Sequence, residues 1–305
     1  MSIAVGHAAP ELDPAATSDV AQKELITEIA DNDDAGVRVL GWTVRVGKML
    51  LSAVVSVAAV AAFWQLFLTL TDVDPFIGRG PADVFEYVFT SPEAAANRAV
   101  LVAASIITLR DAFLGLIVGL IVAMVAATTF NLLRSVEQTV MPMAMVLQSV
   151  PLVAMTPIIA LIFGRGLLTA VLITAIVTFF PALVNVNLAL RGAPAQTMDL
   201  MRAYGASQWT TLYKVQFPSA LPAVFASLRI AAPLAVVGAM LAEWLATSEG
   251  LGYLMLQSGV LYNMNQLWAA GALITFFSVV LYQVVSSVEA AVLTKYAPEH
   301  TATSL

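Results

Sequence analysis

Five long windows of the chain contain no Asp, Glu, Lys or Arg, and they constrain the fold more than any other feature. They cover residues 49–71, 112–133, 138–164, 166–190 and 250–288. A helix needs about 20 apolar residues to cross the hydrocarbon core of a bilayer, and each window is long enough. Membrane β-barrels instead alternate apolar and polar residues in segments of about 10 residues. The windows therefore predict an all-α, polytopic membrane protein.

The composition excludes a water-soluble globular protein and most catalytic classes. Charged residues make up 11% of the 305 residues, whereas a soluble domain carries about 25%. The chain has no cysteine, which excludes disulfides, thiolate metal sites and cysteine nucleophiles. Its two histidines, His7 and His300, lie in polar tails. We therefore expect no catalytic residue, no metal site and no cofactor bound by this chain itself.

About six membrane-spanning helices are predicted. They cover approximately residues 49–71, 103–130, 138–163, 167–190, 222–247 and 267–290. In the second span, Gly115 and Gly119 form a Gly-x-x-x-Gly step that predicts close helix packing. A short helix is expected around Asp83 and Glu86. The last uncharged window is too long for one helix, so residues 249–264 are expected to form a short external or re-entrant segment.

Three regions follow from these windows. They are an N-terminal tail at residues 1–45, a transmembrane domain at residues 46–297 and a C-terminal tail at residues 298–305. The N-terminal tail is acidic and rich in Ala and Pro, which predicts partial disorder. It is not a secretory signal, because no basic segment precedes a short apolar run. An amphipathic turn around Leu25–Ile29 is the alternative, and the role of the tail stays open.

Lysine and arginine in the short loops predict the orientation in the membrane. With a cytoplasmic N-terminus, the cytoplasmic segments hold Arg38, Arg45, Lys48, Arg134, Arg191, Arg202, Lys214 and Lys295. The outer segments then hold Arg79, Arg98 and Arg165, with Arg110 near the outer end of the second span. We therefore expect a multi-pass protein of the cell membrane, inner or plasma, with both termini in the cytoplasm.

A polar stretch at residues 191–220 separates the fourth and fifth predicted spans. Pro194 suits the first turn of a helix. Asp199 is expected near the positive end of that helix. Gly205 can adopt the left-handed conformation that ends a helix and turns the chain.

Residues 206–216 are predicted to form a second helix, which Pro218 and Pro222 stop before the fifth span. The expected product is a helix–glycine turn–helix hairpin whose turn points away from the bilayer. The alternative is an ordinary amphipathic loop that lies on the membrane surface.

The spacing of this stretch resembles the cytoplasmic coupling loop of ABC-transporter permeases. That pattern is Glu-Ala-Ala, three residues, Gly, nine residues, Ile, one residue and Leu-Pro. Here it reads Asp199-Leu200-Met201, Gly205, Val215 and Phe217-Pro218. The bulkier Leu200 and Met201 imply different detailed contacts from the usual alanines. The resemblance assigns contact with a partner ATPase to nine residues: Asp199, Leu200, Met201, Ala203, Tyr204, Gly205, Ala206, Ser207 and Trp209.

Other stretches within residues 80–290 resemble the branch of these permeases that serves nitrate, sulfonates, taurine and pyrimidine vitamin precursors. They include Thr108-Leu109-Arg110, Gln148-Ser149-Val150-Pro151, Phe179-Phe180-Pro181, Leu228-Arg229-Ile230-Ala231 and Gly250-Leu251-Gly252-Tyr253. The resemblance implies the permease fold of a type I ABC importer, with a cytoplasmic coupling helix in the loop at residues 191–220.

The resemblance also implies an assembly. Two permease chains line the path, expected as a homodimer, although pairing with a sister chain stays open. Two cytoplasmic ATPase subunits hold ATP and Mg²⁺, and an extracytoplasmic solute-binding protein delivers the solute. The lipid bilayer surrounds the permease, and no nucleic acid is involved. The chain has no Gly-x-x-x-x-Gly-Lys-Ser/Thr loop, so we expect a non-catalytic permease subunit.

The expected cargo is a small solute. It is either an organic or inorganic anion of the sulfonate, taurine or nitrate type, or a pyrimidine-type vitamin precursor, and the sequence leaves this choice open. The alternative function is an autonomous ion-coupled secondary transporter. That class predicts inverted repeats and coupling-ion sites near the membrane midplane. The sequence contains no convincing internal repeat, and its predicted spans are nearly free of acids.

Six polar side chains in the predicted spans are candidates for the translocation path or its gate: Gln148, Ser149, Thr156, Asn185, Arg229 and Glu243. The first three share the third span with Pro142, Pro151 and Pro157, and helix breaks are tolerated in a membrane where they line a cavity. Ionisable side chains at membrane depth usually face the bundle interior or a pathway. For each candidate, a purely structural role in hydrogen bonding, helix packing or ion pairing stays open.

Overall fold

The computed structural model describes residue 55 and residues 58–296. Both predicted tails, at residues 1–45 and 298–305, lie outside this part of the chain, as does the start of the first predicted span. Two compact units divide after Asp72. The first contains the apolar helix Ala58–Leu70, which lies within the predicted span at residues 49–71. All helices named below belong to the second unit.

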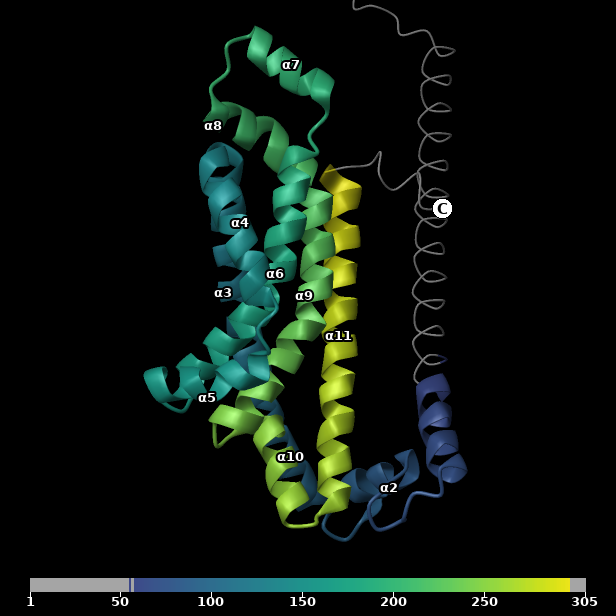
Figure 1. Ribbon diagram of the computed structural model, residues 1–305. Coiled ribbons are helices and arrows are strands. Elements are labelled where there is room, and N and C mark those ends of the chain that lie inside the picture. The colour runs from purple at the N-terminus through teal and green to yellow at the C-terminus, as the bar shows by residue number, and fades with distance from the viewer. Residues whose placement is uncertain (1–54, 56–57, 297–305) are drawn as a thin grey trace, which may run out of the picture. The chain divides into compact units, whose positions relative to one another are not determined.

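The second unit consists of helices, and no strand is found among the described residues (Figure 1). The helices are α2 (Pro81–Phe85), α3 (Ala94–Leu132), α4 (Arg134–Gln148), α5 (Leu152–Phe163), α6 (Leu167–Arg191), α7 (Ala195–Ala203), α8 (Gln208–Thr211), α9 (Phe217–Ala246), α10 (Gly250–Val260) and α11 (Met264–Tyr296). Two π-helical turns, η1 (Glu86–Thr90) and η2 (Leu212–Gln216), follow α2 and α8. The short helix expected around Asp83 and Glu86 is thus confirmed.

Four helices are long and apolar enough to cross a membrane. They are α3, α6, the continuous helix Gln208–Ala246 and α11. The pair α4 and α5 also qualifies when taken as one broken span. The described part of the chain therefore has four spans, or five with the broken pair, and the predicted class of all-α polytopic membrane protein is confirmed.

The helices α3, α6 and α9 approach one another closely because small residues face each other. Gly115 of α3 lies against Thr174 of α6, and Gly119, one turn later, lies against Thr178. A methyl group at either glycine would overlap these neighbours. Gly238 of α9 also lies against Thr174. The Gly-x-x-x-Gly step is therefore confirmed as a helix contact, which is typical of membrane helices that associate through packing.

Buried alanines extend this contact along the three helices: Ala123, Ala127, Ala170, Ala182, Ala231, Ala232, Ala235 and Ala239. The helices α10 and α11 complete the core, where Leu251, Leu254 and Ile274 pack against α3 and α9. Figure 1 shows α6, α9 and α11 running side by side through the unit. We call α3, α6 and α9 the central trio.

The predicted span at residues 138–163 is not one continuous helix. The structure contains two helices, α4 and α5, whose axes differ in direction by 102°. The break falls at residues 149–151, where Pro151 precedes α5 with a ψ of 118°. Pro142 and Pro157 remain inside α4 and α5. Of the three prolines, only Pro151 lies at the break, and α5 turns across the bundle instead of continuing along it (Figure 1).

The predicted stop at Pro218 and Pro222 is wrong. The helix that starts at Gln208 continues to Ala246, through the π-helical turn η2. A proline normally clashes with the carbonyl four residues earlier and lacks the N–H that would bond to it. A π-turn shifts the hydrogen-bond register, and such a turn directly precedes Pro218. The coupling stretch and the fifth span therefore form one rod.

Residues 249–264 form α10 and the turn into α11. Gly250 begins α10 with a φ of 93°, a left-handed conformation that favours glycine. Figure 1 shows that α10 runs on in the direction of α9, away from the hairpin end of the bundle. The chain turns into α11 after α10. The short segment is thus present, and it continues in the direction of α9.

Candidate coupling and translocation site

The predicted hairpin lies at one end of the bundle, beyond the ends of α3, α4 and α6 (Figure 1). Its first helix, α7, follows Pro194. At its end, the Gly205 N–H donates to the Arg202 carbonyl at 3.0 Å, and the Ala206 N–H donates to the Met201 carbonyl at 2.9 Å. Gly205 has a φ of 65°. This Schellman motif fixes the turn, so the predicted helix–glycine turn–helix structure is confirmed.

The second helix of the hairpin begins with a side-chain cap. The Thr210 N–H donates to the Ser207 hydroxyl oxygen at 3.2 Å, which satisfies a helix N-terminal donor. Near the turn, Tyr204 is 82% exposed and Leu200 is 54% exposed. Aromatic side chains are enriched in protein–protein contacts. The hairpin therefore exposes apolar side chains next to a turn that backbone hydrogen bonds fix.

Asp199, Met201 and Ala203 lie on α7. Asp199 is the fifth of the nine residues of α7, so it does not lie in the first turn as predicted. The favourable interaction with the helix N-terminus is confined to that turn and does not reach it. Its carboxylate instead lies 3.4 Å from the Arg202 guanidinium, with both side chains exposed. Such an exposed pair contributes little to stability.

A polar pair ties the far end of the hairpin to α3. The Asn131 amide N–H donates to the Gln216 side-chain oxygen at 2.7 Å, and the Gln216 amide N–H donates back to Asn131 at 3.4 Å. Gln216 is buried, and Leu212, one turn earlier, is only 1% exposed. The rod that carries α8 is therefore fixed against the end of α3.

A second polar cluster joins the near end of the hairpin to α4. Glu137, in the first turn of α4, accepts a hydrogen bond from the Asn187 amide at 2.9 Å and forms an ion pair with Arg191, the last residue of α6. Sequence reasoning missed this cluster because Glu137 lay one residue outside the predicted span. The spacing of Asn187 and Arg191, four residues apart on one helix face, was the available signal.

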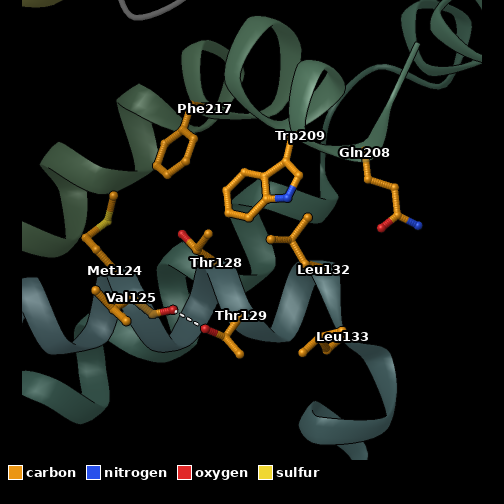
Figure 2. Close-up of a pocket in the computed structure, with 9 residues that line it drawn as sticks. All are labelled: Met124, Val125, Thr128, Thr129, Leu132, Leu133, Gln208, Trp209 and Phe217. Atoms are coloured by element: carbon orange, nitrogen blue, oxygen red, sulfur yellow. Dashed lines mark hydrogen bonds between the residues drawn. The ribbon is translucent and has the colours of Figure 1, made fainter.

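An apolar groove of about 600 Å³ lies between α3 and the start of the rod (Figure 2). It is lined by Met124, Val125, Thr128, Thr129, Leu132, Leu133, Gln208, Trp209 and Phe217. In Figure 2 the Trp209 ring points toward α3, near Leu132 and Thr128. Trp209, assigned by resemblance to the ATPase contact, thus extends back over α3 from the hairpin.

The three path candidates from the third predicted span lie near the break between α4 and α5. Gln148 and Ser149 are exposed, and the Ser149 hydroxyl donates to the Val146 carbonyl at 2.7 Å. Thr156 is buried, and its hydroxyl donates to the Leu152 carbonyl at 2.9 Å. The two hydroxyls therefore bond to their own helices, while the Gln148 side chain is exposed at the break.

The path candidate Arg229, and Arg110 of α3, are each paired with an acid. The Arg229 guanidinium of α9 lies 3.2 Å from the Glu289 carboxylate of α11. Arg110 of α3 lies 2.8 Å from Asp111, as expected for neighbouring charges at this depth. Asn185, on α6, is half-buried. Ion pairing within the bundle therefore accounts for both arginines in structural terms.

Glu243 is fully buried where α3, α9 and α10 meet. One carboxylate oxygen accepts from the Thr108 hydroxyl and from the Gly252 N–H, each at 2.9 Å. The Leu251 N–H in turn donates to the Thr108 hydroxyl oxygen at 2.8 Å. A side chain on Gly250 would overlap the carboxylate. Glu243 thus joins the start of α10 to α3 and α9.

No cluster of three or more His, Asp or Glu side chains suited to a metal ion is present in the described part of the chain.

Residues 115–296 match the model of one protein family, described as the binding-protein-dependent transport system inner membrane component. The chain belongs to this family. It is a permease of the ABC importer type and a multi-pass membrane protein.

Curated relatives support this assignment. A probable ABC transporter permease of Haemophilus influenzae is 30% identical over 233 residues, which are 76% of this chain and 93% of the relative. The riboflavin transport permease RibX of Chloroflexus aurantiacus is 31% identical over 75% of this chain and 84% of its own length. Further relatives are named as permeases for formylaminopyrimidine, aliphatic sulfonates and nitrate. The predicted branch of the family is therefore confirmed.

A solved structure has the same fold. The inward-facing MetNI methionine ABC transporter contains a chain that aligns with a TM-score of 0.54 and 21% identity. The alignment covers 67% of the permease described here and 99% of that chain. The predicted permease fold is confirmed.

Proposed function

We propose that this permease is the non-catalytic membrane subunit of a transporter in which the α7–α8 hairpin, residues 195–211, binds a partner ATPase. The observation that carries the proposal is the hairpin itself. Its turn is fixed by backbone hydrogen bonds around Gly205, it carries the exposed Tyr204 and Leu200, and it lies at one end of the bundle. Its far end continues as one rod to Ala246.

The partner ATPase supplies the energy. ATP and Mg²⁺ bind to two copies of that subunit, because the permease sequence has no phosphate-binding glycine loop. A second permease chain, as a homodimer, completes the translocation path, and an extracytoplasmic binding protein delivers the solute. Dimerisation of the ATPases upon binding ATP draws the two hairpins together and switches access to the path.

The hairpin end of the bundle faces the cytoplasm in this proposal, as do both termini. Arg134, Arg191, Arg202 and Lys214 belong to segments at that end, whereas Arg79 and Arg98 belong to segments at the other. An excess of basic residues on the cytoplasmic side is the general rule for short membrane loops.

The solute is a small heteroaromatic molecule of the pyrimidine or flavin type. The riboflavin relative is 31% identical over 228 residues, whereas the sulfonate relative from Bacillus subtilis is 26% identical over 227 residues. The formylaminopyrimidine relative is 38% identical over 140 residues. In addition, Glu289 already neutralises Arg229, the cationic path candidate, which makes an anion binding there less favourable.

Co-purification tests the coupling proposal. The tagged permease, extracted from its native membrane in mild detergent, is expected to bring an ATPase with it in equal amounts. Ala206→Asp places a charge at the turn and should abolish this association. Ala82→Asp, the same change at an exposed site of α2 at the other end of the bundle, is the matched control. A permease that purifies alone, and whose uptake survives ATP depletion, contradicts the proposal.

Uptake by cells that produce or lack the permease tests the solute class. Labelled riboflavin, a formylaminopyrimidine, an aliphatic sulfonate and nitrate are compared. Uptake of either heteroaromatic compound that depends on the permease supports the assignment. Dependence confined to the sulfonate or to nitrate contradicts it and leaves the coupling proposal intact.

A further inference from the structure

Three polar side chains meet where α6 ends and α4 begins. Glu137 is 8% exposed, and its two carboxylate oxygens have different partners, the Asn187 amide at 2.9 Å and the Arg191 guanidinium. Asn187 is 5% exposed, and its amide nitrogen faces Glu137. We call Glu137, Asn187 and Arg191 the α4–α6 clasp.

Local geometry explains why the clasp forms. Asn187 and Arg191 lie one turn apart on α6, so both reach the same neighbour. Glu137 lies in the first turn of α4, where the helix N-terminus favours a negative charge. A buried carboxylate needs both a charge partner and hydrogen bonds, and the clasp supplies both. Loss of either partner therefore leaves the other members of the clasp unsatisfied.

The position of the clasp in the chain gives it a mechanical consequence. Arg191 is the last residue of α6, and α7 of the hairpin begins only four residues later, at Ala195. On the other side, α4 leads directly to the break at residues 149–151 and to α5. A displacement of the near end of the hairpin therefore acts on Arg191 first, and through Glu137 on α4.

Beyond its start, α4 exposes several large apolar side chains. Met143, Val146 and Leu147 are all more than half exposed, in contrast to the buried residues of the central trio. Val136 and Met141, near the start of α4, pack partly against the core of α3 and α6. The buried polar contacts of α4 thus lie at its start, where the clasp is.

We propose that Glu137, Asn187 and Arg191 are positioning residues that transmit movement of the coupling hairpin to the broken span α4–α5. The inference rests on the proposed function, because it requires an ATPase that moves the hairpin. The Asn131–Gln216 pair is the natural comparison. It ties the rod that follows the hairpin to α3, a member of the central trio, and neither of its two hydrogen bonds reaches α4.

The test is a charge exchange in the permease–ATPase complex. The chain has no cysteine, so Ile121→Cys on α3 and Leu161→Cys on α5 give a specific spin-label pair; both side chains are exposed. The label distance is measured without nucleotide and with ATP trapped, with labelled chain diluted into unlabelled chain. In the parent complex, the distance is expected to change when ATP is trapped.

Glu137→Arg and Arg191→Glu, each alone, should abolish the ATP-dependent change in distance while the ATPase still co-purifies and hydrolyses ATP. The double variant Glu137→Arg/Arg191→Glu restores the ion pair and should restore the change. Glu137→Gln keeps one acceptor oxygen for Asn187 or Arg191 and removes only the charge, so it guards against misfolding of the reversed variants and should retain a reduced change. Asn131→Ala is the matched control and should keep the full change.

A full change in distance in both single variants overturns the clasp proposal, as does a double variant that folds and binds ATPase but shows no recovery. Loss of the change in Asn131→Ala to the same degree also overturns it, because the effect would then not be specific to α4. Failure of the unsubstituted permease to bind any ATPase would instead overturn the proposed function.

Discussion

The central trio and the broken span α4–α5 are both apolar, yet they are packed in different ways. In the trio, glycines, threonines and alanines bring α3, α6 and α9 into close contact, and most of these residues are fully buried. In α5, Leu161 is 86% exposed and Ile162 68% exposed. The comparison indicates two separate requirements. Apolar composition makes a helix suited to the membrane, whereas small residues allow it to pack closely against neighbouring helices.

The physical reason is the solvent. Lipid tails are as apolar as leucine, so large exposed side chains gain little by moving from lipid to protein, and helices associate through close packing and hydrogen bonds. The trio has both. The broken span has no glycine contact like that of Gly115 and Gly119. It is attached by the clasp at Glu137. Buried or partly buried side chains also attach it: Met141, Ala144, Thr156 and Ile159. The trio is therefore the densely packed part of this chain, and the broken span is the part whose large side chains are exposed.

The largest effect is expected at Glu243, which joins α10 to the trio. Glu243→Ala leaves the buried Gly252 N–H without its acceptor and breaks the Thr108 bond between α3 and α9, although the Thr108 hydroxyl can still donate to the Ala104 carbonyl; the free energy of unfolding should fall by about 3 kcal/mol. Glu243→Gln keeps an acceptor in place, so its loss should be about 1 kcal/mol. Denaturant unfolding in detergent measures both. Equal losses would mean that the hydrogen bonds do not hold α10 to the trio.

A smaller effect is expected for Gly119→Ala in the trio. The new methyl group would overlap the Thr178 side chain and come 2.8 Å from the Ala175 carbonyl oxygen, so the helices must separate. Overpacking of this kind should lower the free energy of unfolding by about 2 kcal/mol. Gly271→Ala is the matched control, because its nearest neighbour is the Met255 side chain at 3.6 Å. A Gly119 variant as stable as the control would contradict close packing of the trio.

The smallest effect is expected at Leu161 of α5. Because this side chain is almost fully exposed, Leu161→Ala should change the free energy of unfolding by less than about 0.5 kcal/mol. Thermal unfolding of the isolated permease checks this. A loss as large as that of Gly119→Ala would show that α5 is packed like the trio, and the distinction between the two regions would fail.

Much of the helix bundle could be predicted from the sequence, because uncharged windows and glycine spacing are local signals. The windows located α3, α6 and α11, and the Gly115–Gly119 step identified a real contact. The Gly205 turn followed from its spacing and from the conformations that glycine allows. These features depend on residues that are close in the chain.

The remaining features depend on contacts between distant residues. Pro218 and Pro222 resembled a helix stop, but the helix Gln208–Ala246 runs through both. Three prolines predicted a bend within one span, and the sequence could not show that only Pro151 lies at a break of 102°. Glu137 lay outside the predicted span, and its partners, Asn187 and Arg191, are 50 or more residues away. Their role depends on how α4 packs against α6.

Hydrogen–deuterium exchange can show whether a coupled ATPase moves the broken span relative to the central trio. The permease–ATPase complex is compared without nucleotide and with ATP trapped. We expect exchange to change in the hairpin, residues 195–211, and in α4–α5, and to stay the same in α3, α6 and α9. Unchanged exchange in α4–α5, or a change of equal size throughout the trio, would contradict the account.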